Sequence, residues 1–350
     1  MELSHRVAGL RLAEPFRISR GTTTTQELVW VEIAVHGAAG YGEAAPQPHY
    51  GESVESASAF LDDAGELLGE DPFALEAIGG RFAELPGEMA AKAAVDAALH
   101  DLCGKLLGLP TWRLLGLARA GPPTSWTVWL GDPDEMARRA GGADPRFRRL
   151  KLKLGGRDGL DVERVRAVRS VTDLPLMVDV NEYWATDEAL ENVGELAALG
   201  VEYVEQPLRA GDPEGARLKK KSPLPIYVDE DCHTLADVRS CAERAHGVNV
   251  KLAKSGGIRE AVRISVAARS LGLGVMLGCM LESGLGIAAG CQVASLCDYV
   301  DLDGNLLLAE DPWRGVEFRE GVQLPSDSPG LGVVPAAAEE TARTGMREER

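Results

Sequence analysis

Polar side chains recur at near-even intervals along the middle of this chain, each at the end of an apolar, β-branched run. Five of them follow one another at steps of 26, 26, 24 and 22 residues, namely Lys153, Asp179, Glu205, Asp229 and Lys251. Each step is close to the length of one strand, helix and loop unit. The spacing therefore predicts parallel strands whose carboxyl ends bring these residues to one rim of a barrel, where barrel enzymes keep their chemistry.

The apolar runs that carry these residues alternate with helical stretches, which predicts parallel pairing through right-handed crossovers. Eight such runs occur, namely SWTVWL, RLKLKL, PLMVDV, VEYVEQ, PIYVDE, GVNVKL, GVMLGC and the weaker DYVDLD. We expect an α/β fold, a modified TIM barrel of the (β/α)7β type, over residues 121–315. Residues 316–350 are expected to return to the preceding domain and to end in a frayed tail.

Residues 1–120 have a different pattern and are expected to form an α+β capping domain. Alternating runs up to residue 45 predict antiparallel strands around a flexible polar loop at 15–26, PFRISRGTTTTQ. Helical periodicity follows, and it is strongest at 90–108, where apolar residues recur at four-residue steps along one stripe.

Composition limits the partners of the chain. Its net charge of −17 and pI near 4.9 disfavour nucleic acid and anionic membrane surfaces, so small molecules are the expected partners. The six cysteines form no CxxC pair, which favours a reducing cytoplasm, and no run of about 18 apolar residues occurs. A length of 350 residues suits a barrel with a smaller second domain.

Three carboxylates at matched positions predict a metal site. Oxygen ligands from Asp179, Glu205 and Asp229 suit Mg²⁺ or Mn²⁺ better than zinc. A single such aspartate would more often cap a helix, but three at matched steps favour the metal. Asn181 could order a ligand or a water molecule, with a turn asparagine as the equal alternative.

The run RLKLKL has the period of a strand, so its leucines face one side and Lys151 and Lys153 the other. A half-exposed strand with solvated lysines is the alternative. Because a parallel strand covered by helices has no solvent face, we expect the lysines to point into the barrel mouth. Glu230 is a candidate partner for the Lys251 ammonium, unless it forms a surface salt bridge. All six histidines are interpreted as structural or surface residues.

Two lysines beside a metal site suggest a particular chemistry. A metal that holds a substrate carboxylate, with an amine near each face of the α-carbon, is the arrangement needed to remove and return a weakly acidic α-proton. A lysine can act as the base only if burial and cationic neighbours lower its pKa toward ~7 to 8. On this hypothesis Lys153 and Lys251 face each other across the barrel mouth.

The same motifs resemble those of the enolase superfamily, specifically its muconate-lactonising subgroup. They stand in this chain as LKLKLGG, VDVNEYW, VEQPL, VDEDCHT and VKLAKSGGI, so the resemblance covers nearly the whole sequence. It implies one Mg²⁺, or Mn²⁺, per subunit and a capping domain that closes the barrel with two mobile loops, here RGTTTTQ and PQPHYGES. A homo-oligomer is also expected.

Members that epimerise dipeptides carry a DxD motif near the eighth strand, matched here by Asp301 and Asp303 in VDLDGN. The resemblance implies that these carboxylates hold the free α-ammonium group of the substrate and that Thr127, Lys151 and Met280 contribute to the substrate pocket. We therefore predict a dipeptide epimerase that inverts the α-carbon of the C-terminal residue through an enediolate.

Side-chain preference stays open at this stage. Members specific for Ala-Glu carry an arginine shortly after the RG of the first mobile loop, where this chain has Thr23, and Arg17 or Arg20 could substitute. Racemisation of N-acylated amino acids, or a cycloisomerase or dehydratase step of the same subgroup, is the main rival. A metal-binding barrel without catalysis is the rival of another class, and the two lysines argue against it.

Overall fold

The computed structural model describes residues 1–336, so the expected frayed tail lies outside the described residues. The first part of the chain forms a three-stranded antiparallel sheet of β1 (Glu2–Ile18), β2 (Gly21–Val35) and β3 (Ala38–Ala44). Three helices bury their apolar faces against this sheet, namely α1 (Val54–Leu68), α2 (Leu75–Ala83) and α3 (Met89–Leu107). Helix α3 confirms the predicted helix at 90–108.

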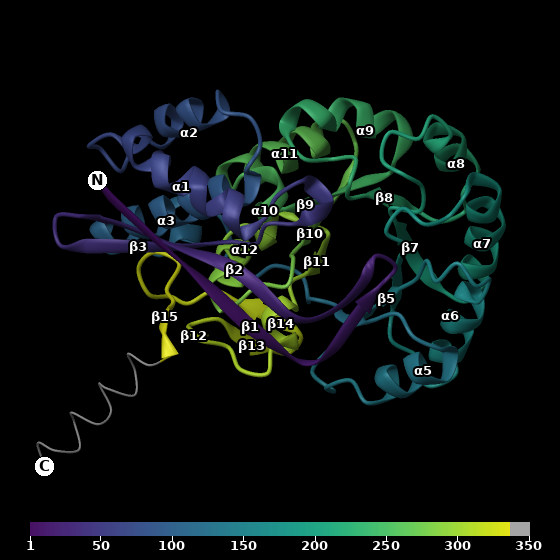
Figure 1. The fold of residues 1–350 in the computed structure, drawn as a ribbon. Coiled ribbons are helices and arrows are strands. Elements are labelled where there is room, and N and C mark those ends of the chain that lie inside the picture. Colours follow the sequence, from purple (N-terminus) through teal and green to yellow (C-terminus); the bar gives the residue numbers. More distant parts are fainter. Residues whose placement is uncertain (337–350) are drawn as a thin grey trace, which may run out of the picture.

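The expected flexible loop at 15–26 is wrong. Strands β1 and β2 continue to pair through this segment, with Phe16 opposite Thr23 and Ile18 opposite Gly21, so that Ser19 and Arg20 alone form the turn. The run of threonines is β-branched and fits a strand once a partner strand lies beside it. The result is a long hairpin, drawn in purple in Figure 1, that extends from the capping domain toward the barrel.

The barrel confirms the predicted fold. Its eight parallel strands pair in chain order and coincide with the eight apolar runs: β4 (Trp126–Val128), β5 (Leu150–Lys153), β6 (Leu176–Asp179), β7 (Val201–Glu205), β8 (Ile226–Val228), β9 (Gly247–Lys251), β10 (Gly274–Gly278) and β11 (Tyr299–Asp301). The sheet closes where Ser125 donates its backbone N–H to the Val300 carbonyl at 3.0 Å.

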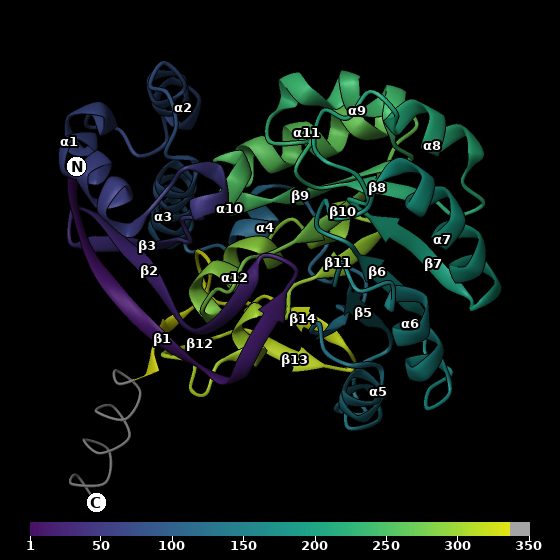
Figure 2. The ribbon, with the colours of Figure 1, turned by 45° about the vertical axis from the view of Figure 1, so that its right-hand side comes forward.

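A helix follows each of the first seven strands, which gives the (β/α)7β order. These helices are α5 (Pro133–Gly141), α6 (Asp161–Arg169), α7 (Thr186–Ala198), α8 (Gly215–Lys221), α9 (Val238–Arg244), α11 (Ile258–Ser270) and α12 (Gly284–Cys291). Figures 1 and 2 show helices around the outside of the sheet and α1 to α3 beside the barrel. Two apolar clusters fill the space between the strands and this ring.

The barrel interior is filled by large side chains directly below the polar rim. Met177, Tyr203, Tyr227 and Met276 form a buried cluster, with Tyr299 packed against it. Each of the five lies two residues before the rim residue of its strand and so points into the same interior. This layer is the floor that carries the rim carboxylates.

The last described segment adds two short antiparallel strand pairs and contacts the capping domain. Strand β12 (Trp313–Arg314) pairs with β15 (Val334–Pro335), and β13 (Glu317–Arg319) pairs with β14 (Val322–Leu324). The Asp101 carboxylate on α3 accepts the backbone N–H of Leu331 at 2.7 Å, and the Gly330 carbonyl accepts the N–H of Thr111. Within residues 1–336, every helix is too short or too polar to pass through a lipid bilayer.

Candidate active site

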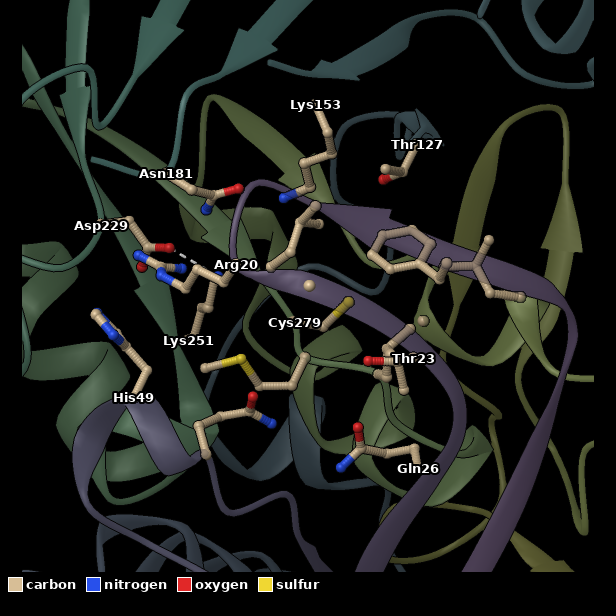
Figure 3. A pocket seen from close by; sticks show the side chains of 18 of the residues that line it. Arg20, Thr23, Gln26, His49, Thr127, Lys153, Asn181, Asp229, Lys251 and Cys279 are labelled. Carbon is tan, nitrogen blue, oxygen red and sulfur yellow. Dashed lines mark ion pairs between the residues drawn. The ribbon is translucent and has the colours of Figure 1, made fainter. Parts of the chain in front are cut away.

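A cavity of about 620 Å³ lies at the carboxyl ends of the barrel strands and is lined from the other side by the hairpin tip and residues 47–50 (Figure 3). The predicted site residues gather here. Nine of them line the cavity: Thr127, Lys153, Asn181, Asp229, Glu230, Lys251, Met280, Asp301 and Asp303. The other three, Lys151, Asp179 and Glu205, are buried in contact with this group.

The three predicted metal ligands come from neighbouring strands. Asp179 and Glu205 face each other in the register of β6 and β7, Asp229 follows β8, and all three side chains are buried. Burial alone would raise the pKa of Asp179 and of Asp229, but the charges of nearby lysines outweigh it and lower both pKa values. Burial and the charge of Asp179 raise the pKa of Glu205. The two aspartates are therefore anionic at neutral pH.

These oxygens have unused capacity as ligands. Glu205 Oε2 and both carboxylate oxygens of Asp229 are buried, and each of these oxygens has two lone pairs. One ammonium group lies beside each of them: Lys151 Nζ at 2.7 Å from Glu205 Oε2, and Lys251 and Lys254 Nζ at 2.7 and 2.6 Å from the Asp229 oxygens. Carboxylate oxygens with a second lone pair are the donor set that Mg²⁺ and Mn²⁺ prefer, so the chemistry of these residues fits a divalent cation, although among residues 1–336 the three carboxylates do not bring one oxygen each within 4.8 Å of one another.

The two predicted acid/base lysines reach the cavity from opposite strands. Lys153 ends β5 and Lys251 ends β9, which are four strands apart in a closed sheet of eight. Their Nζ atoms lie 2.6 Å from Asp179 Oδ2 and 2.7 Å from Asp229 Oδ2. Figure 3 shows the two side chains entering the cavity from different sides. Burial alone would lower the pKa of Lys251, but Asp229 and other anionic groups raise it, which is opposite to the lowering expected from the sequence for a lysine that acts as a base.

The partner predicted for Glu230 is wrong. The Glu230 carboxylate accepts a hydrogen bond from the guanidinium of Arg20 at the hairpin tip. Lys251 pairs with Asp229 instead. Arg20 also donates to Glu182 Oε2 at 2.8 Å, and His49 Nε2 lies 3.0 Å from the same oxygen. The hairpin tip and the turn at Pro48–Tyr50 are thus tied to the barrel mouth by charge.

His49 corrects the interpretation of the histidines, because it lines the cavity. Among residues 1–336, one group of side chains could hold a metal ion. It consists of His49, Glu182 and Glu230, whose potential ligand atoms lie within 4.8 Å of one another. The Arg20 guanidinium binds both of these glutamates, so the cluster already has a cationic partner. We therefore assign the cluster to closure of the site and not to a cation.

The two carboxylates of the DxD motif have different surroundings. Asp301 accepts the Ser125 hydroxyl and pairs with Lys151 Nζ at 2.7 Å. Asp303 accepts the backbone N–H of Thr127 at 2.7 Å. Burial and the neighbouring Asp301 raise the pKa of Asp303 to about 7. Asp303 would therefore be stabilised in its charged form by an incoming cation.

Sequence reasoning missed several groups at this site. Lys254 donates from Nζ to the Asn249 carbonyl at 2.9 Å and holds Asp229, and its place three residues after Lys251 was the available signal. Arg20 was considered only as a partner for an acidic substrate side chain, and its actual partners, Glu182 and Glu230, have no local signal in the sequence. Asn181 is a turn residue with a left-handed φ of 51°, as one of its two alternatives predicts, and it also lines the cavity.

A capping sheet on a (β/α)7β barrel, with carboxylates and lysines on the rim, defines a class of protein, and comparison with known families gives the same class. Residues 134–339 match the description "Enolase C-terminal domain-like". Residues 2–116 match "Mandelate racemase / muconate lactonizing enzyme, N-terminal domain". The chain belongs to the enolase superfamily, in the mandelate racemase and muconate lactonizing enzyme family.

Known relatives resemble the chain over nearly its whole length. The L-Ala-D/L-Glu epimerase of Bacteroides thetaiotaomicron is 40% identical over 93% of this chain and 85% of the relative. The hydrophobic dipeptide epimerase of Roseobacter litoralis is 37% identical over 95% of this chain and 99% of the relative. The crystal structure of a dipeptide epimerase from Enterococcus faecalis, complexed with Mg and L-Leu-L-Tyr, has a TM-score of 0.89 at 30% identity and covers 95% of this chain and 98% of that one.

Proposed function

We propose that this chain is a metal-dependent dipeptide epimerase, which inverts the α-carbon of the C-terminal residue by 1,1-proton transfer. The observation that carries the proposal is the pair Lys153 and Lys251, which reach one cavity from opposite strands above three buried carboxylates. The activities named for the relatives support it, because dipeptides are their substrates.

Asp179, Glu205 and Asp229 would hold one Mg²⁺, or Mn²⁺, per subunit, which would stabilise the negative charge that develops on the substrate carboxylate. One lysine takes the α-proton on its Nζ, and the other returns a proton to the opposite face of the planar enediolate. Each lysine must leave its aspartate to do so.

Asp301 and Asp303 would receive the α-ammonium group of the substrate. Asp303 is the better placed of the two, because its oxygens are not neutralised by Lys151. Lys151 instead keeps Asp301 and Glu205 in place, while Thr127 and Met280 shape the cavity wall.

The direct test is incorporation of deuterium. Incubation of the protein with Mg²⁺ and L,L-dipeptide pools in D₂O should add one mass unit at the α-carbon of the C-terminal residue. Lys153→Met and Lys251→Met should each lower epimerisation at least about a thousandfold. Lys220→Met, on the exposed face of α8, is the control with the same loss of charge. Failure of every dipeptide to exchange would refute the proposal.

Racemisation of N-acylated amino acids is the rival activity. It is considered because the known structure of an N-succinyl Arg/Lys racemase from Bacillus cereus also resembles this chain, with a TM-score of 0.90. Such substrates have no free ammonium group. Asp303→Asn should therefore abolish exchange of dipeptides and leave exchange of N-acyl amino acids nearly unchanged.

A cytoplasmic location and a homo-oligomeric state belong to the same proposal. The six cysteines are all free thiols, which supports a reducing compartment. Size-exclusion chromatography with light scattering would test the oligomeric state.

A further inference from the structure

The wall of the cavity formed by the two strands of the hairpin, next to its Ser19–Arg20 turn, is uncharged. Phe16 and Thr23 are cross-strand partners and share a face with Ile18, and these three side chains line the cavity together with Gln26. Arg17, two residues before the turn, is exposed and is not part of the lining. Arg17 and Arg20 were the two arginines that could have paired with an acidic side chain of the substrate, and Arg17 lies outside the cavity.

Every cationic side chain of the lining already has an anionic partner. Arg20 and His49 both contact Glu182, at 2.8 and 3.0 Å, and Arg20 also binds a second glutamate. Burial and the charge of Arg20 lower the pKa of His49, so this ring is neutral at pH 7. Lys153 and Lys251 pair here with the carboxylates of the cavity floor, and the proposed function assigns both to the α-carbon, so neither is available as a counter-ion for a substrate side chain. The lining therefore offers no spare positive charge.

The negative charges of the lining are almost fully balanced as well. Asp229 and Glu230 lie against lysine and arginine side chains, and Asp301 lies against Lys151. Among residues 1–336, the Asp303 carboxylate is bound by the backbone N–H and the side chain of Thr127 and forms no ion pair with a lysine or arginine. One anionic position remains, and the α-ammonium group of a dipeptide fills it.

We infer that the substrates are dipeptides whose side chains carry no charge, with an apolar or amide side chain on the residue that is epimerised. The inference rests on the proposed function and narrows it. A charged side chain would lose its hydration in this cavity without gaining a counter-ion, which is costly. Phe16, Ile18, Met280, Leu281 and Leu307 give an apolar side chain a surface to pack on.

Isosteric pairs of substrates isolate the effect of charge. L-Ala-L-Gln and L-Ala-L-Glu have the same shape, and L-Ala-L-Met and L-Ala-L-Lys have side chains of similar length. We expect kcat/KM for exchange in D₂O to be at least about tenfold higher for the uncharged member of each pair. Equal or higher values for the glutamate or lysine dipeptide would overturn the inference while leaving the proposed function intact. Absence of exchange with all four would overturn both.

A substitution on the hairpin tests the position of the uncharged wall. Thr23→Arg adds a cation to the lining, and it should raise the L-Ala-L-Glu to L-Ala-L-Gln ratio of kcat/KM at least about tenfold. Thr24→Arg adds the same charge to the adjacent exposed residue outside the lining and should leave the ratio unchanged. Thermal midpoints of the two variants show whether both fold. An unchanged ratio in a folded Thr23→Arg protein would contradict the role of this wall.

Discussion

A buried carboxyl group at the contact between the capping domain and the barrel should make stability depend on pH. Glu282, in the turn after β10, accepts the backbone N–H of Met280 at 3.0 Å. Glu43 on β3 accepts Trp30 Nε1 at 2.7 Å and the hydroxyl of Ser283. A Cβ built on Gly286 would lie 2.7 Å from Glu43 Oε1 and 2.9 Å from Glu282 Oε2, so these oxygens are at most about 5.6 Å apart.

Burial, and then the neighbouring Glu43, raise the pKa of Glu282 from its ordinary 4.5 to about 8. Between these two values the folded protein holds a proton that the unfolded chain has released. The free energy of unfolding must therefore fall as the pH rises through this window. One proton corresponds to about 1.4 kcal/mol per pH unit, so the whole window is worth at most about 5 kcal/mol.

Replacing Glu282 by Gln removes this proton while keeping the shape of the side chain. Unfolding in urea should give similar stabilities for Glu282→Gln and the unaltered protein at pH 5, and the variant should become the more stable of the two by several kcal/mol near pH 9. Glu191→Gln, at an exposed position of α7, should follow the unaltered protein at every pH. If the Glu282→Gln curve also runs parallel to that of the unaltered protein from pH 5 to 9, the reasoning is refuted.

Three further predictions concern the barrel floor, the metal and the catalytic lysines. A Cβ on Gly247 would come within 2.2 Å of the Tyr227 ring, so Gly247→Ala should cost at least about 2 kcal/mol in urea unfolding. Gly194→Ala, in a helix with open space around it, should instead gain up to about 1 kcal/mol. Mg²⁺ at a hundredfold its Kd should raise the free energy of unfolding by about 2.7 kcal/mol, and calorimetry should show that Asp229→Asn loses this gain. Lys251→Met should retain Mg²⁺ binding while losing epimerisation, and loss of both would mean that the site itself had collapsed.

The sequence was sufficient for the features that repeat locally. A period of two in RLKLKL turned Lys151 and Lys153 inward, and the steps of 22 to 26 residues placed five strand ends on one rim. Both signals come from backbone geometry, because side chains alternate along a strand and one strand, helix and loop unit has a nearly constant length. The same alternation gives the layer of tyrosines and methionines below the rim, although we did not predict it.

Only the tertiary structure decided which charge lies beside which. Arg20 and Glu230 are 210 positions apart in the chain, and no local pattern relates them. Asp229, which precedes Glu230 in the sequence, forms the ion pair with Lys251 because the strand ends bring those two side chains together. The threonine run was ambiguous for a related reason: it forms a strand only where another strand lies beside it, and β1 is that strand. Ion pairs and strand pairing depend on distances in space, which the linear sequence does not contain.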